Sequence, residues 1–390
     1  MRTHQVTVAA IRVIVVPLLL AGAAAGIAPA GPAAAVTTGV GARAGLGVWA
    51  DLGARVGSGV RVGLAGLVRS FDPRGTLVGV AATSARNAWA VGTTEGSKAL
   101  ILHWNGVAWN QVPSHAPAGD DQLIGVAAIS ARNAWAVGTI GTGGGGKTLI
   151  LHWNGTSWNQ VRSPSPNASG NVLVGVAATS ARNAWAVGLT ATDRTLILHW
   201  NGTAWKRAAS PEPANGAILF DVAATSASDA WAVGFAGDKT LILRWNGIIW
   251  KRVRTPSLPR ESLLFGVAAT SARNAWAVGS VDGEVGTLIL RWNGAAWKRV
   301  HTPSPLDSNL NDVAATSARN AWAVGSSGIG AKPLILRWNG TTWKQVHTPS
   351  SAVNILEDVA ATSAHNAWAV GNDYKSRRVL IMRWNGTTWK

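Results

Sequence analysis

Short apolar runs alternate with turn residues along most of the chain. Within one representative stretch, such runs cover residues 311–317, 321–325, 333–339 and 341–346. Ser-Ala-Arg-Asn, a glycine-rich loop and Asn-Gly separate the four runs, and a Pro/Ser-rich loop precedes the next unit. Runs this short, rich in β-branched and aromatic residues and parted by turn residues, predict antiparallel strands joined by hairpins. A helical unit would need apolar residues at a spacing of 3.6, which these runs lack.

The four-strand unit recurs seven times at intervals of about 46 residues. Asn-Ala-Trp-Ala-Val-Gly, once with Asp in first place, puts a tryptophan at positions 89, 135, 185, 231, 276, 322 and 368. A second tryptophan follows before Asn-Gly, and a third lies five residues after the second. Three positions in seven units account for 21 of the 22 tryptophans, and Trp49 is the other one. This repeat predicts an all-β fold, a seven-bladed β-propeller with four antiparallel strands per blade, over residues 67–390.

The repeated tryptophans are expected to pack between blades. In Ala-Trp-Ala-Val-Gly, Trp and Val project from one side of the strand and the two Ala from the other. A blade is buried on both faces, so the bulky face of one blade can lie on the small face of the next. Each buried indole then contributes about 2–3 kcal/mol by area. A stacking platform for a sugar or a base is the alternative.

The third unit carries a resemblance to known propellers. Its strand Trp185-Ala186-Val187-Gly188 and its turn Asn201-Gly202-Thr203-Ala204-Trp205 resemble the repeats of Asp-box (sialidase-type) and photosystem II assembly-factor-like propellers. The unit also looks like the tandem repeats of secreted bacterial proteins, and the resemblance covers residues 76–390. Where Asp-box repeats have the turn Asp, this chain has Trp200, so Asn201 is expected to form the turn. Such families include glycosidases, receptors and assembly factors, so the resemblance implies the fold and leaves the function open.

The N-terminal segment is typical of an export signal. Arg2 and Arg12 precede or border an apolar stretch at 13–20, and Ala28-Pro29-Ala30 fits a cleavage site. We therefore expect residues 1–35 to be a signal peptide and residues 36–66 a flexible linker. The mature protein is then secreted, extracellular or associated with the cell wall. An uncleaved membrane anchor is the alternative, which the prolines of this segment disfavour.

The charge balance is strongly basic. Lys and Arg number 35 against 18 Asp and Glu, a net charge of +17, and the chain has no Cys. The absence of Cys excludes disulfide scaffolds, thiolate metal sites and cysteine nucleophiles. A basic surface favours anionic partners. For an exported protein, we expect an acidic glycan or anionic cell-wall polymer rather than nucleic acid.

The loops predict which face binds a ligand. In four antiparallel strands, the first and third loops emerge on one face of the ring and the second and fourth on the other. The first and third loops are nearly constant, whereas the second and fourth differ between units. Loops on rigid scaffolds commonly carry recognition, so we predict that the variable face binds a protein or glycan; drift without constraint is the alternative. The candidate binding residues are Glu95, Lys147, Asp193, Asp238, Asp282 and Tyr374.

Two further sets of residues occupy equivalent positions in several units. Asp221, Asp312 and Asp358 precede the Val of the first strand, where the other units have Gly. If the first strand is innermost, they lie near the central channel and could bind Ca²⁺, or they make local turn hydrogen bonds. A ring of arginines on the constant face could hold a polyanion, or could be solvated turn residues. Its members are Arg86, Arg132, Arg182, Arg273 and Arg319.

Signals for an enzyme are weak. A sialidase-like site needs a tyrosine nucleophile, and the only tyrosine is Tyr374. A glycosidase pair such as Glu261 with Glu357 stays open. The segment 141–148 matches a phosphate-loop pattern, but a strand follows it instead of a helix. We therefore predict a monomeric, non-catalytic binding propeller with no cofactor other than the Ca²⁺ considered above. The alternatives are a glycan-processing hydrolase and a cell-wall or assembly scaffold that uses the basic face.

The chain also offers a candidate for closing the ring. Val68-Arg69-Ser70 aligns with Val161-Arg162-Ser163 at the end of the second unit. Residues 66–70 could therefore complete the outer strand of the last blade. The alternatives are that the chain is truncated or that this outer strand is short.

Overall fold

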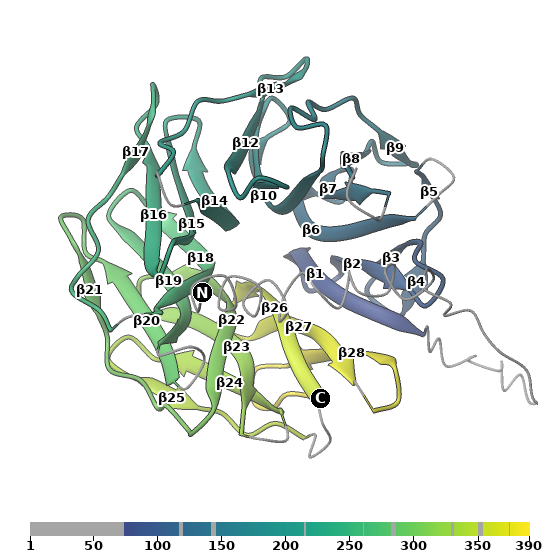
Figure 1. The fold of residues 1–390 in the computed structure, drawn as a ribbon. Coiled ribbons are helices and arrows are strands. Elements are labelled where there is room, and N and C mark those ends of the chain that lie inside the picture. The colour runs from purple at the N-terminus through teal and green to yellow at the C-terminus, as the bar shows by residue number, and fades with distance from the viewer. Residues whose placement is uncertain are drawn as a thin grey trace, which may run out of the picture.

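The computed structural model describes residues 74–116, 120–141, 146–213, 216–259, 261–281, 286–328, 331–349, 354–373 and 375–390. They form seven blades arranged in a ring around a central axis (Figure 1). The predicted all-β, seven-bladed propeller is confirmed, and the described residues contain no helix. The predicted signal peptide, the linker and the candidate strand at 66–70 lie outside the described residues.

Each blade is built from strands that follow one another in the chain. Blade 1 comprises β1 (Gly75–Ser84), β2 (Asn87–Thr94), β3 (Ala99–Trp104) and β4 (Trp109–Gln111). Blade 2 comprises β6 (Asp121–Ser130), β7 (Asn133–Ile140), β8 (Lys147–Trp153) and β9 (Trp158–Gln160), and the short strand β5 (Ser114–His115) pairs with β9. Blade 3 comprises β10 (Asn171–Ser180), β11 (Asn183–Thr190), β12 (Thr195–Trp200) and β13 (Trp205–Arg207).

Blades 4 to 7 repeat this order. They comprise β14 (Ala217–Ser226), β15 (Asp229–Ala236), β16 (Lys239–Trp245) and β17 (Trp250–Arg252); β18 (Leu263–Ser271), β19 (Asn274–Val281), β20 (Gly286–Trp292) and β21 (Trp297–Arg299); β22 (Ser308–Ser317), β23 (Asn320–Ser327), β24 (Lys332–Trp338) and β25 (Trp343–Gln345); and β26 (Asn354–Ser363), β27 (Asn366–Asp373) and β28 (Arg378–Trp384). In blade 7, a single bridge between Trp384 and Trp389 takes the place of the fourth strand.

A β-bulge interrupts the first strand of every blade. In β14, the pairing with β15 shifts register between Leu219 and Asp221, which leaves Phe220 outside the ladder. The same shift occurs at the equivalent position in the other six blades. Bulges bend a strand and re-aim its side chains. Because first strands of neighbouring blades contact one another around the axis, the bulge residues lie at the centre of the ring.

Tryptophans fill the interfaces between blades, as predicted. Trp276 of β19 is fully buried and packs on the Ala-bearing face of blade 6, against Ala321 and Ala323. Its ring lies 5.0 Å from that of Trp338 and 5.2 Å from that of Trp343, the latter pair edge-to-face. Offset and edge-to-face aromatic pairs are the favoured geometries, so these contacts add to the area buried.

The third-strand tryptophans and their neighbours hold the first turns in place. The Trp338 indole Nε1 donates to the carbonyl of Ala318, 3.1 Å away. Arg291 places its guanidinium 4.9 Å from the Trp276 ring centroid and also donates to Ala318. Blades 1 to 3 have His at the position of this Arg, and His103 stacks on Trp89 at 4.1 Å. Burial lowers the pKa of His103, so this ring is neutral at pH 7.

The expected role of Asn201 is confirmed. Its Oδ1 accepts hydrogen bonds from the backbone N–H groups of Thr203 and Ala204, each at 3.0 Å. These hydrogen bonds form an Asx turn, in which the asparagine side chain mimics a backbone turn. The Asn-Gly turns of the other blades form the same contacts.

The ring closes by packing of blade 1 against blade 7. The Leu77 amide donates to Asn372 Oδ1 at 2.8 Å, and the Trp368 ring lies 5.0 Å from that of Trp104. The position beside Arg383, where a fourth strand would pair, is occupied by Lys390, and the two residues exchange backbone hydrogen bonds of 2.9 and 3.0 Å. The assignment of residues 66–70 to this blade stays a prediction.

Candidate functional site at the centre of the ring

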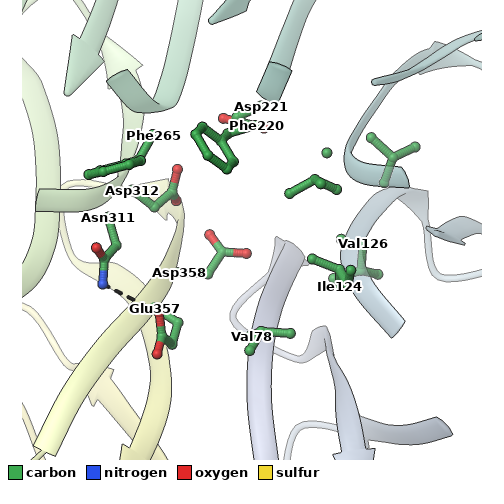
Figure 2. Close-up of a pocket in the computed structure, with 14 residues that line it drawn as sticks. Val78, Ile124, Val126, Phe220, Asp221, Phe265, Asn311, Asp312, Glu357 and Asp358 are labelled. Carbon is green, nitrogen blue, oxygen red and sulfur yellow. Dashed lines mark hydrogen bonds between the residues drawn. The ribbon is translucent and has the colours of Figure 1, made fainter. Parts of the chain in front are cut away.

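A cavity of about 90 Å³ lies where the first strands of all seven blades meet (Figure 2). Its walls consist of the bulge residues and the residues that follow them. Blades 1 to 5 contribute apolar bulge residues, and blades 6 and 7 contribute polar ones. These bulge residues are Val78, Ile124, Val174, Phe220, Phe265, Asn311 and Glu357. The cavity therefore has an apolar wall and a wall that carries amide and carboxyl groups.

The three equivalent aspartates lie in the cavity wall, where the sequence predicts them. Asp221 Oδ1 accepts the N–H of Val222 at 2.7 Å, and its Oδ2 accepts the N–H of Val267 in the next blade at 2.8 Å. Asp358 likewise bridges Val359 of its own blade, at 2.6 Å, and Val80 of blade 1, at 2.7 Å. These carboxyls join neighbouring blades, which a local turn hydrogen bond would not do.

The Asp312 and Asp358 side chains meet at the interface between blades 6 and 7. Asp312 Oδ2 accepts the N–H of Val359 at 3.1 Å, and Asp358 Oδ1 accepts the same N–H at 2.6 Å. Burial, followed by the neighbouring Asp358 charge, raises the pKa of Asp312 well above its usual range. Two buried carboxyl groups that face the same N–H do not both ionise easily, because like charges disfavour the ionised form. Burial also raises the pKa of Asp358, and that of Asp221 to about 7.

The polar wall extends to two residues that sequence reasoning did not place there. Asn311 donates through Nδ2 to the carbonyl of Leu356 at 2.9 Å and to Glu357 Oε2 at 3.3 Å. Glu357 is 9% exposed. Glu261, considered as its partner in a glycosidase pair, lies in the loop before β18 and does not line the cavity. The structure therefore does not bring these two glutamates together in this cavity.

The apolar wall was also missed at the sequence level. The Phe220 and Phe265 rings lie 5.5 Å apart in adjacent blades, and both side chains are 3% exposed. A residue that interrupts strand alternation carries no periodic signal. The available signal was the comparison of units, because the bulge position holds Val, Ile, Phe, Asn or Glu, whereas the residue before it is always Leu and the residue after it is Gly or Asp.

The candidate residues of the variable face are spread over several blades. Glu95, Lys147, Asp193 and Asp238 lie in or beside the second loops of blades 1 to 4, and none lines the central cavity. Asp193 adopts a positive φ of 52°, and its carbonyl accepts the Ala217 amide at 2.8 Å. The backbone of Asp193 therefore supports the loop itself. Asp282 and Tyr374 lie outside the described residues.

The arginine ring lies on the opposite face, as predicted. Arg86, Arg132, Arg182, Arg273 and Arg319 occupy the first turns and are exposed.

The calcium hypothesis gains no further support from geometry. Among the residues that the structure describes, no group of three or more His, Asp or Glu side chains is placed to hold a metal ion. The carboxyl oxygens of Asp221 and Asp358 already accept backbone N–H groups. Binding of Ca²⁺ stays a prediction.

No helix of the described residues is long and apolar enough to cross a membrane.

The comparisons place the fold among known propellers. No model of a known protein family matches the sequence, and no curated protein matches it. The structure of YCF48 bound to D1 peptide is 17% identical, with a TM-score of 0.56 over 80% of this chain and 94% of that chain. YCF48 from Cyanidioschyzon merolae is also 17% identical, with a TM-score of 0.56 over 79% of this chain and 96% of that one. A fucose-specific lectin from Aleuria aurantia is 11% identical, with a TM-score of 0.48 over 82% and 96%.

These likenesses concern the fold alone, because the identities are low. Together with the seven four-stranded blades, they define the protein as a seven-bladed β-propeller. The resemblance to photosystem II assembly-factor-like propellers is confirmed at this level. Secretion and a bacterial source stay predictions.

Proposed function

We propose that this protein is a secreted, non-catalytic binding module that holds its ligand on the variable face, with the central cavity as the anchor point. The observation that carries the proposal is the cavity formed jointly by all seven first strands. The bulges lie in the first half of each first strand, toward the loops that differ between blades. A ligand spread over the variable loops can therefore insert one group into the centre.

The chemistry of the walls favours a polypeptide ligand. Phe220 and Phe265 offer an apolar surface, and Glu357 offers a carboxyl group beside it. An aliphatic side chain that ends in an ammonium group, as in lysine, matches both walls. Pockets of this kind obtain affinity from apolar contacts and specificity from a few polar groups. A volume of about 90 Å³ suits one such side chain better than a whole ligand.

A glycan ligand is the second candidate. The exposed large apolar side chains of the described residues are Val107, Ile248, Ile249 and Leu306, none of them aromatic. The described surface thus lacks a fully exposed aromatic ring on which a sugar could stack. The use of this fold for a peptide in YCF48 is a further precedent for the polypeptide reading.

The bonding of the carboxyls supports a non-catalytic role. Asp221 and Asp358 each accept two backbone N–H groups, and Asp312 accepts one. A general acid or base must exchange its proton with substrate. These carboxyl groups instead stabilise the contacts between adjacent blades.

Binding screens on two libraries test the proposal. The protein is applied to a peptide array with lysine at varied positions and to a glycan array, each with and without Ca²⁺. We expect lysine-containing peptides to bind and the Glu357→Gln variant to bind them about tenfold more weakly, since a hydrogen bond to a charged group is lost. Arg319→Gln, on the opposite face, is the matched control and should bind like the wild type.

Other outcomes would overturn parts of the proposal. Binding only to glycans, with the same loss in Glu357→Gln, would replace the polypeptide ligand by a sugar. Hydrolysis of a glycoside or peptide that Asp312→Asn abolishes would show an enzyme. Binding that neither Glu357→Gln nor Asp221→Asn weakens would remove the cavity from the ligand site.

A further inference from the structure

The acidic residues of the propeller's loops lie on only one of its two faces. The seven first turns and seven third turns, which share one face, contain no Asp or Glu. The nearest acid is Asp229, the first residue of β15, which is 7% exposed and paired with Arg244 at 2.8 Å. The second and fourth loops, on the other face, carry acids in several blades, among them Glu95, Asp193 and Glu212. The face of the first and third turns, called the basic face below, therefore carries five exposed arginines and no acidic residue in its turns.

The arginines of the basic face present their charged ends to solvent. The five ring arginines are exposed, and none takes part in the ion pairs formed among the described residues. Their side-chain stems lie on the glycine of the neighbouring third turn. A Cβ added to Gly106 would lie 3.2 Å from Arg86 Cβ, and one added to Gly202 would lie 3.1 Å from Arg182 Cγ. The stems are thus supported at equivalent points around the ring.

Apolar side chains project from the same face. Three of the four exposed large hydrophobic residues in the described chain lie in third turns. Val107 in blade 1 is 85% exposed, and Ile248 and Ile249 in blade 4 are 78% and 48% exposed. The corresponding positions of the other blades hold only Thr, Ser or Ala. These three aliphatic side chains are therefore accessible to a partner that approaches the basic face.

Blade 4 differs from the other blades at two adjacent points. Ser228 stands where five blades have arginine, and the isoleucine pair lies in the third turn next to it. A Cβ added to Gly247 would lie 3.1 Å from Ser228 Cβ, so the two turns are in contact. The first turn of blade 4 therefore has no charged side chain beside the exposed isoleucine pair. This combination is what insertion into an apolar layer requires.

We propose that the basic face docks on the surface of a lipid bilayer that contains anionic lipids. The ring arginines contact the headgroups, and Val107, Ile248 and Ile249 insert at the boundary with the acyl chains. Blades 1 and 4 lie on different sides of the ring (Figure 1). Two apolar contacts on different sides of the ring, with arginines around them, can touch a flat surface at the same time. The variable face then points away from the membrane, toward its own ligand.

A soluble polyanion fits the same face less well. A linear polymer follows a groove or a stripe of charge, whereas these cations are distributed around a circle. Such a polymer is also solvated on all sides and gains nothing from aliphatic tips. The apolar residues therefore decide between the two anionic partners.

Vesicle binding with a local probe tests the proposal on the full chain. The apolar segment at 13–20 could itself bind lipid, so the readout must report on the basic face. The chain has no Cys, which allows single labels at Ile248→Cys or Val107→Cys with an environment-sensitive fluorophore. The matched control is Leu306→Cys, since Leu306 is 81% exposed and lies in a fourth loop on the other face.

With vesicles of phosphatidylcholine and phosphatidylglycerol, we expect a blue shift of the label at 248 and at 107 and none at 306. Vesicles of phosphatidylcholine alone should give no shift, and added salt should weaken it. In the protein labelled at 107, Ile248→Ser combined with Ile249→Ser should reduce the vesicle affinity at least tenfold. Arg319→Gln should reduce it about fivefold, the share of one basic residue near an anionic surface, and Leu306→Ser should leave it unchanged.

Two results would overturn the proposal. Equal shifts at 248 and 306 would show that the chain binds vesicles without using this face. Binding of a soluble polyanion such as heparin, with no response to vesicles and no effect of the isoleucine substitutions, would assign the face to a polymer.

Discussion

At the residue scale, three aspartates replace glycine beside the ring axis and change what the centre of the molecule can do. In blades with glycine there, the backbones of adjacent first strands come close. In blades 4, 6 and 7, the carboxyl of Asp221, Asp312 or Asp358 reaches the backbone N–H of the following blade instead. Each of these aspartates therefore joins two blades and also places a carboxyl group in the cavity wall.

Asp221→Asn is expected to flatten the pH dependence of stability. The pKa of Asp221 is raised from 3.8 to about 7, with burial as the largest cause. Between these values, the folded protein holds a proton that the unfolded chain releases, so stability decreases as pH rises from 3.8 to about 7. The asparagine variant lacks this contribution. Denaturant unfolding at about pH 5 and about pH 8 measures the difference between variant and wild type.

The control for this measurement is Asp307→Asn in an exposed loop. It should keep the wild-type dependence, including the contributions of the buried histidines. Equal pH slopes for Asp221→Asn and the wild type would show that Asp221 is ionised in the folded protein.

At the element scale, the bulge in the first strand decides where side chains point. Alternation alone places every second residue of a strand on one face. The register shift between Leu219 and Asp221 breaks this rule and puts Phe220 and Asp221 into the same cavity. The glycines at the equivalent position permit the close approach of adjacent first strands around the ring.

Gly125→Ala is expected to destabilise the protein. A Cβ at this position would lie 2.5 Å from the Val174 carbonyl oxygen, a backbone atom that cannot move alone. Overpacking of this kind costs about 1–3 kcal/mol. Thermal or denaturant unfolding measures the loss.

Gly96→Ala serves as the control, because its nearest atom would be Thr94 Oγ1 at 3.9 Å. It should change the free energy of unfolding by less than about 0.5 kcal/mol. A similar loss in both variants would mean that close approach at the axis does not explain the glycines.

At the scale of the whole molecule, ring closure depends on one non-covalent interface among the described residues. Blade 1 and blade 7 meet through the Leu77–Asn372 and Val80–Asp358 hydrogen bonds and through packing of Trp368. The chain supplies each blade with its own consecutive strands, and an antiparallel bridge between Arg74 and Arg378 joins the start of blade 1 to blade 7.

Asn372→Ala is expected to loosen this interface. The substitution removes the acceptor of the buried Leu77 amide, and an unpaired buried donor costs about 1–3 kcal/mol. Hydrogen exchange should accelerate in β1 and β27 more than elsewhere. Ser326→Ala, which removes a 2.6 Å bond to Asn309 within blade 6, is the control and should affect that blade only. Exchange that rises equally around the ring would show that blade 1 and blade 7 open together with the rest.

Much of the fold could be predicted, and less of the site. Each blade repeats its tryptophans and its Asn-Gly turn, so blade count, strand order and the packing of Trp276 follow from the repeat. The position of Asp221 near the axis also follows from strand order. The hydrogen bond between the Asp221 carboxyl and the Val267 amide could not be predicted, and neither could the proximity of Phe220 and Phe265. Each depends on how closely adjacent blades approach.

The sequence by itself determined the local structure of this protein. Strand, turn and blade are short-range features, and seven copies of one pattern specify them seven times. Only the tertiary structure decided which residues meet at the centre. Residues about 46 positions apart converge there because the ring closes on itself, and desolvation at that point sets their protonation. The same closure gathers the arginines of separate turns and the aliphatic tips of blades 1 and 4 on one face.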